Sequence, residues 1–468
     1  MSRVQIPLPA PLKKIKQDKN LPQSQEQKNT SQIQKETPSA ENESIINYGE
    51  SPTVEKRKRE RIFRFPDEVA KIIDDVCGGW RRDYLYYLAK ASFELAEVFH
   101  RGENFPLNLE TVFPYTFYFF PKTFSSSFTI FRSLRDVIKK ILDGKDEVVF
   151  YDISAGTCSA SVAFAETLKE IYFADEQNHK NQIHERKDDG KDKSKHKKAK
   201  ENKKKKIKFF VQDISDAALE IGIRILNQSL ENFPFDFEVK KIVSDASRLK
   251  IKQDNPDIAV ISYSLYDIFR EDVEYMIVWV KGVLKSISPH GILIIVEPSL
   301  KKRGSLFIMK IRDALSDYVV APCPLVNFCP MLKRGDDWCH FGVRWVPPFS
   351  LTRAINLIGG RPPDINFSYL VLSQSRDEYF NLPPKDIGRV VSHRLEEKGR
   401  IRFWLCKDGE KQLFQFVKKN ISDENKDVFY VHSGDLVLVQ SYEKKENFFE
   451  IKKDTRFSII HKLFDFDF

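Results

Sequence analysis

Three cysteines lie close together in the last third of the sequence, at Cys323, Cys329 and Cys339. Five and then nine residues separate them, gaps that let one loop wrap a metal centre, and the prolines after the first two stiffen the turns. We expect Cys406, between a predicted strand and a turn, to be the fourth ligand, with His340 as the alternative. Thiolate ligation suits both zinc and iron-sulfur clusters, so these residues predict a metal site without specifying the metal.

The other two cysteines, Cys77 and Cys158, stand alone in the sequence and are expected to be buried structural thiols. Six cysteines in 468 residues are too few for a secreted disulfide scaffold. We therefore predict a reducing compartment.

A second group of residues surrounds a turn of small side chains between a predicted strand and a helix from about Ser159 to Ile171. Such a turn lets a ligand approach the backbone and the helix N-terminus. Doubly wound methyltransferases place an acidic residue and a Gly-x-Gly-x-Gly turn here, around S-adenosylmethionine. Asp152 and Gly156 match that pattern and are predicted cofactor contacts, whereas Ser154 and Cys158 take the outer glycine positions and narrow the space.

Two further carboxylates follow the next predicted strands. Asp213 stands where an acidic side chain would accept the ribose hydroxyls, and Asp245 where one would reach the adenine edge. The alternative is that both aspartates only cap the helices that follow, which Asp does well. The sequence leaves both interpretations open.

The elements that must position these residues alternate between strand-length apolar runs and helical stretches. This repetition predicts an α/β fold, a doubly wound, Rossmann-like parallel sheet with helices on both faces. The predicted strands are 148–153, 207–211, 237–243, 258–263, 292–296 and 369–372.

Composition divides the chain further. The chain begins with a polar tail that has too few apolar residues to fold. Apolar residues at helical spacing follow it, and short predicted strands separated by polar turns come last. The predicted parts are a tail at 1–58, a helical N-terminal domain at 59–145, a methyltransferase-like domain at 146–388 with a cysteine loop at 321–344, and a small β module at 389–468, which includes a strand at 428–430.

Two segments have alternative interpretations. The Lys-rich insertion at 175–206 is either a solvated loop or a contact for RNA phosphates, since neutralised phosphates release counterions. The aromatic stretch at 113–131 either packs in the core or stacks on RNA bases. The formal net charge of +9 is only a mild excess, so the clustering of Lys is the feature that favours a nucleic-acid partner.

No run approaches the roughly 18 apolar residues of a membrane span, so no membrane association is expected. The first residues lack the apolar core of a secretory signal and only weakly favour an organellar transit peptide.

The cysteine loop carries the pattern Ala-Pro-Cys-Pro from Ala321, Cys-Pro from Cys329, Trp-Cys-His-Phe from Trp338, and then Arg344. With this pattern the chain resembles the bacterial and mitochondrial small-ribosomal-subunit methyltransferase-like proteins, which in mitochondria are called assembly factors. Leu325 departs from the pattern, because the family often has His there. The resemblance covers roughly residues 65 to 445, and its other matching segments are 291–298, 367–370 and 406–409.

The resemblance implies a four-iron four-sulfur (4Fe-4S) cluster on Cys323, Cys329, Cys339 and Cys406, rather than zinc. It also implies binding to the rRNA and ribosomal proteins of the small subunit, with an S-adenosylmethionine pocket in the scaffold. The expected compartment is the mitochondrial matrix, with a bacterial cytoplasm as the alternative.

The departures from the family pattern bear on activity. Ser154 and Cys158 replace glycines, and the segment 299–302 replaces a Gly-Thr-Pro-like turn, so we expect an assembly or translation factor. The alternative is an active S-adenosylmethionine-dependent rRNA methyltransferase, in which Tyr263 and Glu297 would face the base.

Overall fold

The computed structural model describes residues 61–101, 103, 106–188, 205–249, 251, 254–323, 328–333, 335, 337–362, 364–379 and 386–464, without the side chains of 175–188 and 303. All of these residues belong to one compact unit. The predicted tail and residues 189–204 of the Lys-rich insertion lie outside the described residues, as do positions 324–327 of the cysteine loop.

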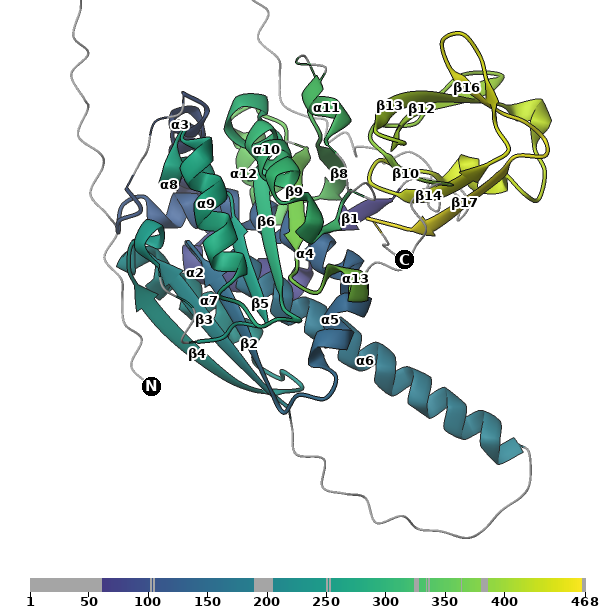
Figure 1. Cartoon of the computed structure of the whole chain (residues 1–468). Helices are drawn as coiled ribbons and strands as arrows, with labels where there is room; N and C mark the ends of the chain where they lie inside the picture. Colours follow the sequence, from purple (N-terminus) through teal and green to yellow (C-terminus); the bar gives the residue numbers. More distant parts are fainter. Residues whose placement is uncertain are drawn as a thin grey trace, which may run out of the picture. The chain divides into compact units, whose positions relative to one another are not determined.

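The central sheet has a parallel core, as predicted, but it is mixed at one side (Figure 1). Its strands run in the order β1-β8-β9-β6-β5-β2-β3-β4, and β7 also pairs with β9. From β6 to β4 all pairs are parallel, whereas β9 lies antiparallel to β6 and to β8. The strands are β1 (Ile62–Arg64), β2 (Glu147–Ile153), β3 (Lys206–Asp213), β4 (Asp236–Val243), β5 (Ile258–Ser262), β6 (Ile292–Pro298), β7 (Val319–Ala321), β8 (Phe341–Val346) and β9 (Ile365–Leu372).

The expectation of an entirely parallel sheet was therefore wrong at β9. A strand joins a parallel neighbour only through a crossover that returns the chain to the same end of the sheet. The segment between β6 and β9 instead contains β7 and β8, which both pair with β9 in the antiparallel sense.

Helices cover both faces of the sheet, which makes the fold a doubly wound α/β fold. One face packs against α2 to α7 and α12, the other against α8, α9 and α10 (Figure 1). The helices are α2 (Asp67–Cys77), α3 (Arg82–Arg101), α4 (Val112–Ser133), α5 (Arg135–Leu142), α6 (Ser159–Asp188), α7 (Asp216–Ser229), α8 (Leu265–Phe269), α9 (Val273–Leu284), α10 (Leu306–Ala314), α11 (Pro330–Lys333), α12 (Phe349–Leu357) and α13 (Arg376–Tyr379). None of the helices in the described ranges is long and apolar enough to cross a membrane.

Two local differences from the sequence predictions concern helices. Helix α6 continues to Asp188 instead of ending near Ile171, because Gln, Glu, Lys and Arg are good helix formers even without an apolar face. The helices before β2 do not have a core of their own, since their apolar side chains belong to the same cluster as the sheet. The aromatic stretch on α4 mostly packs in that core, where Phe117, Phe120 and Phe124 are buried, as its core interpretation predicted.

The C-terminal residues form a second sheet around an apolar core of their own, drawn in yellow-green and yellow in Figure 1. Its main strand order is β15-β16-β13-β12-β10-β14-β17, and β11 pairs with β12. The predicted strand at 428–430 was wrong, because Lys426–Tyr430 is a 3-10 helix that follows the Asn425 turn. The strands are β10 (Ile387–Val390), β11 (Leu395–Glu396), β12 (Arg400–Lys407), β13 (Glu410–Val417), β14 (Leu436–Gln440), β15 (Glu443–Lys444), β16 (Phe449–Ile451) and β17 (Arg456–His461).

Candidate cofactor cavity and cysteine centre

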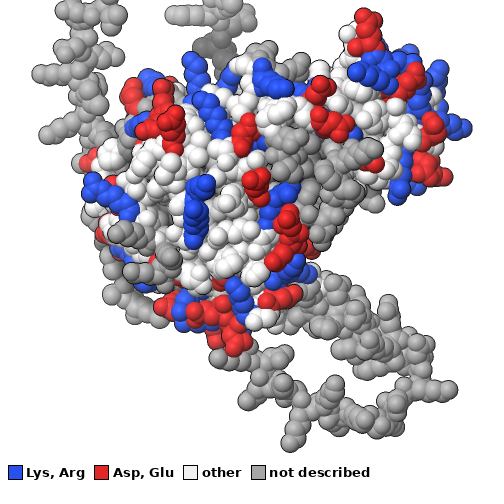
Figure 2. Space-filling model, viewed as in Figure 1, with Lys and Arg blue, Asp and Glu red and all other residues white. Residues whose placement is uncertain are grey.

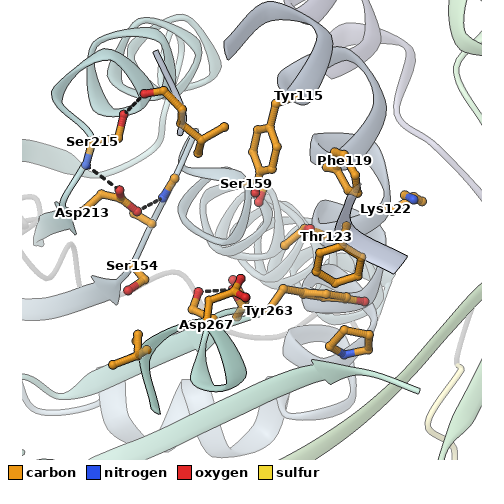
Figure 3. A pocket seen from close by; sticks show the side chains of 18 of the residues that line it. Tyr115, Phe119, Lys122, Thr123, Ser154, Ser159, Asp213, Ser215, Tyr263 and Asp267 are labelled. Atoms are coloured by element: carbon orange, nitrogen blue, oxygen red, sulfur yellow. Dashed lines mark hydrogen bonds between the residues drawn. The ribbon is translucent and has the colours of Figure 1, made fainter. Parts of the chain in front are cut away.

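A cavity of about 640 Å³ opens at the carboxyl ends of β2, β3, β5 and β6 (Figure 3). Its size lies in the range of small-molecule sites, and the carboxyl edge is where open α/β sheets bind ligands. Asp213 and Ser154 lie on one side of it, and Phe119, Lys122 and Thr123 of α4 lie on the opposite side (Figure 3).

The turn after β2 keeps a glycine-type backbone with only one glycine. Ser154, Gly156 and Cys158 have φ angles of 54°, 51° and 61°, in the left-handed region that side chains disfavour. Helix α7 packs closely on this turn, since a Cβ on Gly222 would lie 2.5 Å from the Thr157 carbonyl carbon. The fold therefore holds three residues of this turn in the left-handed conformation, although only one of them is a glycine.

Asp213 lies in the cavity wall and holds the turn. Its two carboxylate oxygens accept hydrogen bonds from the backbone N–H of Gly156 and of Ser215, each at 2.8 Å (Figure 3). Burial raises the pKa of Asp213, and these hydrogen bonds oppose the rise. Each oxygen keeps a second lone pair, so the position is compatible with accepting from ribose hydroxyls as well.

The other two predicted carboxylates differ in position. Asp245 lines the cavity and also caps the turn Ala246–Arg248, accepting from the Ser247 N–H at 2.9 Å, so both of its interpretations fit. Asp152 does not line the cavity: it is fully buried and accepts from the Ser161 N–H at 3.1 Å and hydroxyl at 2.6 Å. Burial raises the pKa of Asp152 to about 7. Asp152 thus positions the first turn of α6 rather than the ligand.

Helix α4 supplies a cavity wall that the sequence reasoning missed. Tyr115 and Phe119 stack on each other with ring centroids 5.0 Å apart, and Lys122 follows on the same side. The Lys122 ammonium lies 3.8 Å from the centroid of the Tyr118 ring, and burial lowers its pKa to about 7. The available signal was the spacing of 115, 119 and 122, which places them on one helix face.

Tyr263 and Glu297, the two residues expected to face a base, differ in their access to the cavity. Tyr263 lines the cavity with a strained φ of 58°, and its hydroxyl lies 3.3 Å from the Ser126 hydroxyl oxygen. Glu297 is buried behind it and accepts from the N–H groups of Ser264 and Leu265 at 3.1 and 2.8 Å. Burial raises the pKa of Glu297 to about 8. Glu297 therefore fixes the loop after β5.

A second, smaller cavity brings together four of the six cysteines. Residues far apart in the chain meet there: Cys323, Cys329 and Cys339 from the loop region after β7, and Cys406 from β12. Cys329 and Cys406 are buried and the other two are half-buried, while Cys77 and Cys158 are buried elsewhere. In the part of the chain that the structure describes, no three His, Cys, Asp or Glu side chains are grouped so that they could hold a metal ion. The thiols thus line a common cavity rather than converging on one point.

The thiols of this cavity act on one another electrostatically. Burial, together with the neighbouring Cys323, raises the pKa of Cys329 to about 12. Burial and the neighbouring thiols raise the pKa values of Cys339 and Cys406 well above the usual range. The alternative ligand His340 does not line the cavity, and its Nδ1 lies 3.2 Å from the Trp338 carbonyl oxygen.

Side chains around the cavity fix its backbone and join the two sheets. The Asp313 carboxylate accepts from the Cys329 N–H at 2.6 Å, and the Ser368 hydroxyl donates to the Cys339 carbonyl at 2.6 Å. Lys411 of β13 forms an ion pair with Asp337 beside the cysteine loop. The cysteine cavity therefore lies at the contact between the α/β body and the C-terminal strands.

Comparison with solved structures finds methyltransferases at low sequence identity. An rRNA methylase from Streptococcus thermophilus is 12% identical, with 36% of this chain and 70% of that chain covered and a TM-score of 0.20. A putative class I S-adenosylmethionine-dependent methyltransferase from Listeria monocytogenes is 10% identical, with coverages of 68% and 89% and a TM-score of 0.31. A putative S-adenosylmethionine-dependent methyltransferase from Methanococcus maripaludis is 13% identical, with coverages of 54% and 87% and a TM-score of 0.24. No curated protein sequence matches the chain.

A family model matches residues 198–435, which is just over half of the chain. The matched segment contains β3 to β9 of the central sheet, the whole cysteine loop and β10 to β13 of the C-terminal sheet, including all four cysteines of the second cavity. The chain belongs to the family described as the mitochondrial small ribosomal subunit protein Rsm22.

Proposed function

We propose that this chain is an assembly or translation factor of the small ribosomal subunit that binds its rRNA and ribosomal proteins through a methyltransferase-like scaffold. Membership of a family named for the mitochondrial small ribosomal subunit carries this proposal. The same membership supports a location in the mitochondrial matrix, with a bacterial cytoplasm as the alternative.

The scaffold carries a 4Fe-4S cluster on Cys323, Cys329, Cys339 and Cys406. The chemistry of the donor set fits such a group, since four thiols line one cavity. A polynuclear cluster spans several ångströms, so its ligands surround a space, whereas a single zinc ion needs its four sulfurs about 2.3 Å from one point. When bound, the cluster supplies folding energy by joining the cysteine loop to β12.

The distribution of charged side chains favours an rRNA interface that covers only part of the molecule. On the face shown in Figure 2, Lys and Arg are interspersed with Asp and Glu, also over the C-terminal strands. Lysines of the C-terminal part form ion pairs within the chain, as Lys452 does with Glu443 and Glu450. Phosphate binding by paired lysines would have to displace these carboxylates, so we expect a modest salt dependence from this module.

The test is sedimentation of tagged protein with small-subunit precursors over a salt series. The wild-type chain should sediment with precursors and leave them as salt increases, because phosphate contacts release counterions. A parallel run with Cys339→Ser asks whether the centre is needed for the association. Protein that stays in the ribosome-free fractions at every salt concentration would contradict the proposal.

A second candidate is an active S-adenosylmethionine-dependent rRNA methyltransferase. The 640 Å³ cavity favours it, because the glycine-type turn, Asp213 and the aromatic wall of α4 are all in place. S-Adenosylmethionine would supply the methyl group there, with Gly156, Asp213 and Asp245 as its contacts, while Asp152 would hold the turn from behind. Calorimetric titration with the cofactor distinguishes the two functions: no heat of binding at millimolar cofactor would eliminate the enzyme.

A further inference from the structure

Arg389 is a buried cation in the wall of the cysteine cavity. Only 4% of the residue is exposed, and it lines the cavity together with the four cysteines. Its Nε donates to the Pro322 carbonyl at 2.5 Å and its Nη1 donates to the Gly434 carbonyl at 2.5 Å. The first of these bonds fixes the backbone immediately before Cys323.

The hydrogen-bond partners of Arg389 are neutral. Other buried arginines nearby have carboxylates: Arg312 pairs with Asp313 at 2.9 Å, and Arg61 pairs with Asp435 at 2.5 Å. Within the described ranges, no ion pair joins Arg389 to a carboxylate, and its bonds go to the two carbonyls. The buried Asp435 carboxylate also interacts with Arg389, but it is already paired with Arg61, so two arginines share one carboxylate and one positive charge is left over. A buried positive charge without an anion of its own is strongly unfavourable, so a further anion is expected beside Arg389.

Besides Asp435, the groups near Arg389 that can supply this further anion are the thiols of the cavity. Cys406 faces Arg389 directly across the β10–β12 pair, and the two side chains point to the same side of the sheet. Four thiolates around an iron-sulfur cluster carry a net negative charge, whereas four neutral thiols carry none. An anionic centre would therefore neutralise Arg389.

We propose that Arg389 is the counter-charge and positioning residue of an anionic thiolate-ligated centre, setting its reduction potential and holding the Cys323 loop against β12. This inference rests on the cluster of the proposed function. Reduction adds an electron to a centre that is already negative, and a fixed positive charge in a poorly polarisable surrounding makes that addition easier. The bond to the Pro322 carbonyl would in addition hold Cys323 in position relative to Cys406, which comes from a distant segment of the chain.

The experiment uses full-length holoprotein purified without oxygen. Iron and sulfide are assayed in the wild type, and the reduction potential is then measured by titration followed by paramagnetic resonance. The variants are Arg389→Met and Arg389→Gln, which remove the charge, and Arg389→Lys, which keeps it. Arg376→Met is the matched control, because Arg376 also donates to a backbone carbonyl, that of Val319 at 2.8 Å, but does not line the cavity.

The expected result is a shift to a more negative potential in Arg389→Met and Arg389→Gln, a smaller shift in Arg389→Lys, and none in Arg376→Met. Iron should also pass to a chelator faster in the two neutral variants. If Arg389→Met does not fold, Arg389→Gln decides, because its amide can still donate to one carbonyl. Neutral variants with an unchanged potential and an unchanged rate of iron loss would overturn the role of Arg389. A wild type without iron and sulfide would instead remove the cluster of the proposed function, and this inference with it.

Discussion

Arg389 and Cys406 face each other on the antiparallel strands β10 and β12, and both side chains line the cavity that also contains Cys323, Cys329 and Cys339. The pair places a cation and a candidate ligand of the C-terminal sheet next to a loop of the α/β body. The two sheets are thus connected at the point where a thiolate centre would stabilise both.

Cys339→Ser should remove the centre and destabilise the chain together. A structural metal site supplies folding energy, and losing one of four ligands also leaves the loop and β12 unconnected. We expect loss of iron and sulfide and a melting temperature several degrees lower. Cys77→Ser is the matched control, because Cys77 is a buried thiol outside the cavity, and its variant should keep the iron. Equal iron and melting temperature in Cys339→Ser and the wild type would contradict the assignment.

Gly222→Ala should be strongly destabilising, because the new Cβ would lie 2.5 Å from the Thr157 backbone and 2.6 Å from the Cys158 sulfur. Overpacking of this kind costs about 1–3 kcal/mol, and here the obstacle is partly backbone, which cannot rotate away. Gly282→Ala, in the last turn of α9 with no atom within 4 Å of the new Cβ, should instead be neutral or stabilising by roughly 0.5–1 kcal/mol. Urea denaturation of both variants measures the difference, and similar midpoints would show that α7 can move away from the turn.

Glu297→Gln should change how stability depends on pH. The pKa of Glu297 is raised by burial from 4.5 to about 8, so between these values the folded state holds a proton that the unfolded state has released. Wild-type stability from this group is therefore present below pH 4.5 and is lost as the pH rises through 8. The glutamine variant cannot titrate at this position. Its free energy of unfolding, measured by urea denaturation, should therefore increase relative to that of the wild type from pH 5 to pH 8. Parallel curves over that range would mean that Glu297 is not buried as a neutral acid.

Lys122→Met should give the opposite slope. The pKa of Lys122 is lowered by burial from 10.5 to about 7, so the unfolded state binds the extra proton between these values. Wild-type stability should therefore rise from pH 7 towards pH 10, and the methionine variant should lack this rise. Melting temperatures over that range provide the measurement. Lys145→Met, which breaks the ion pair with Asp257, should by contrast lower the melting temperature without removing the rise.

The sequence predicted the parts of this fold that depend on local patterns. Strand-length apolar runs located β2, β3, β5, β6 and β9 to within a few residues, because a strand buried on both faces must be almost continuously apolar. The sequence also located β4, although β4 is a largely exposed strand at the edge of the sheet. It did not reveal β1, a three-residue strand beside β8, or the antiparallel direction of β9. Pairing direction depends on how the connecting chain returns, which no local pattern records.

For the sites, residue types and spacing identified Cys323, Cys329, Cys339 and Cys406 before their positions were known, because thiols with intervening prolines are unusual in ordinary cores. Only the tertiary structure brought Cys406 to the other three, and only it placed Arg389 opposite Cys406 and Lys122 in the wall of the larger cavity. It also showed that Asp152 accepts its hydrogen bonds from Ser161 in the first turn of α6. These relationships join residues far apart in the chain, and the close packing of sheets and helices decides which distant side chains share a cavity.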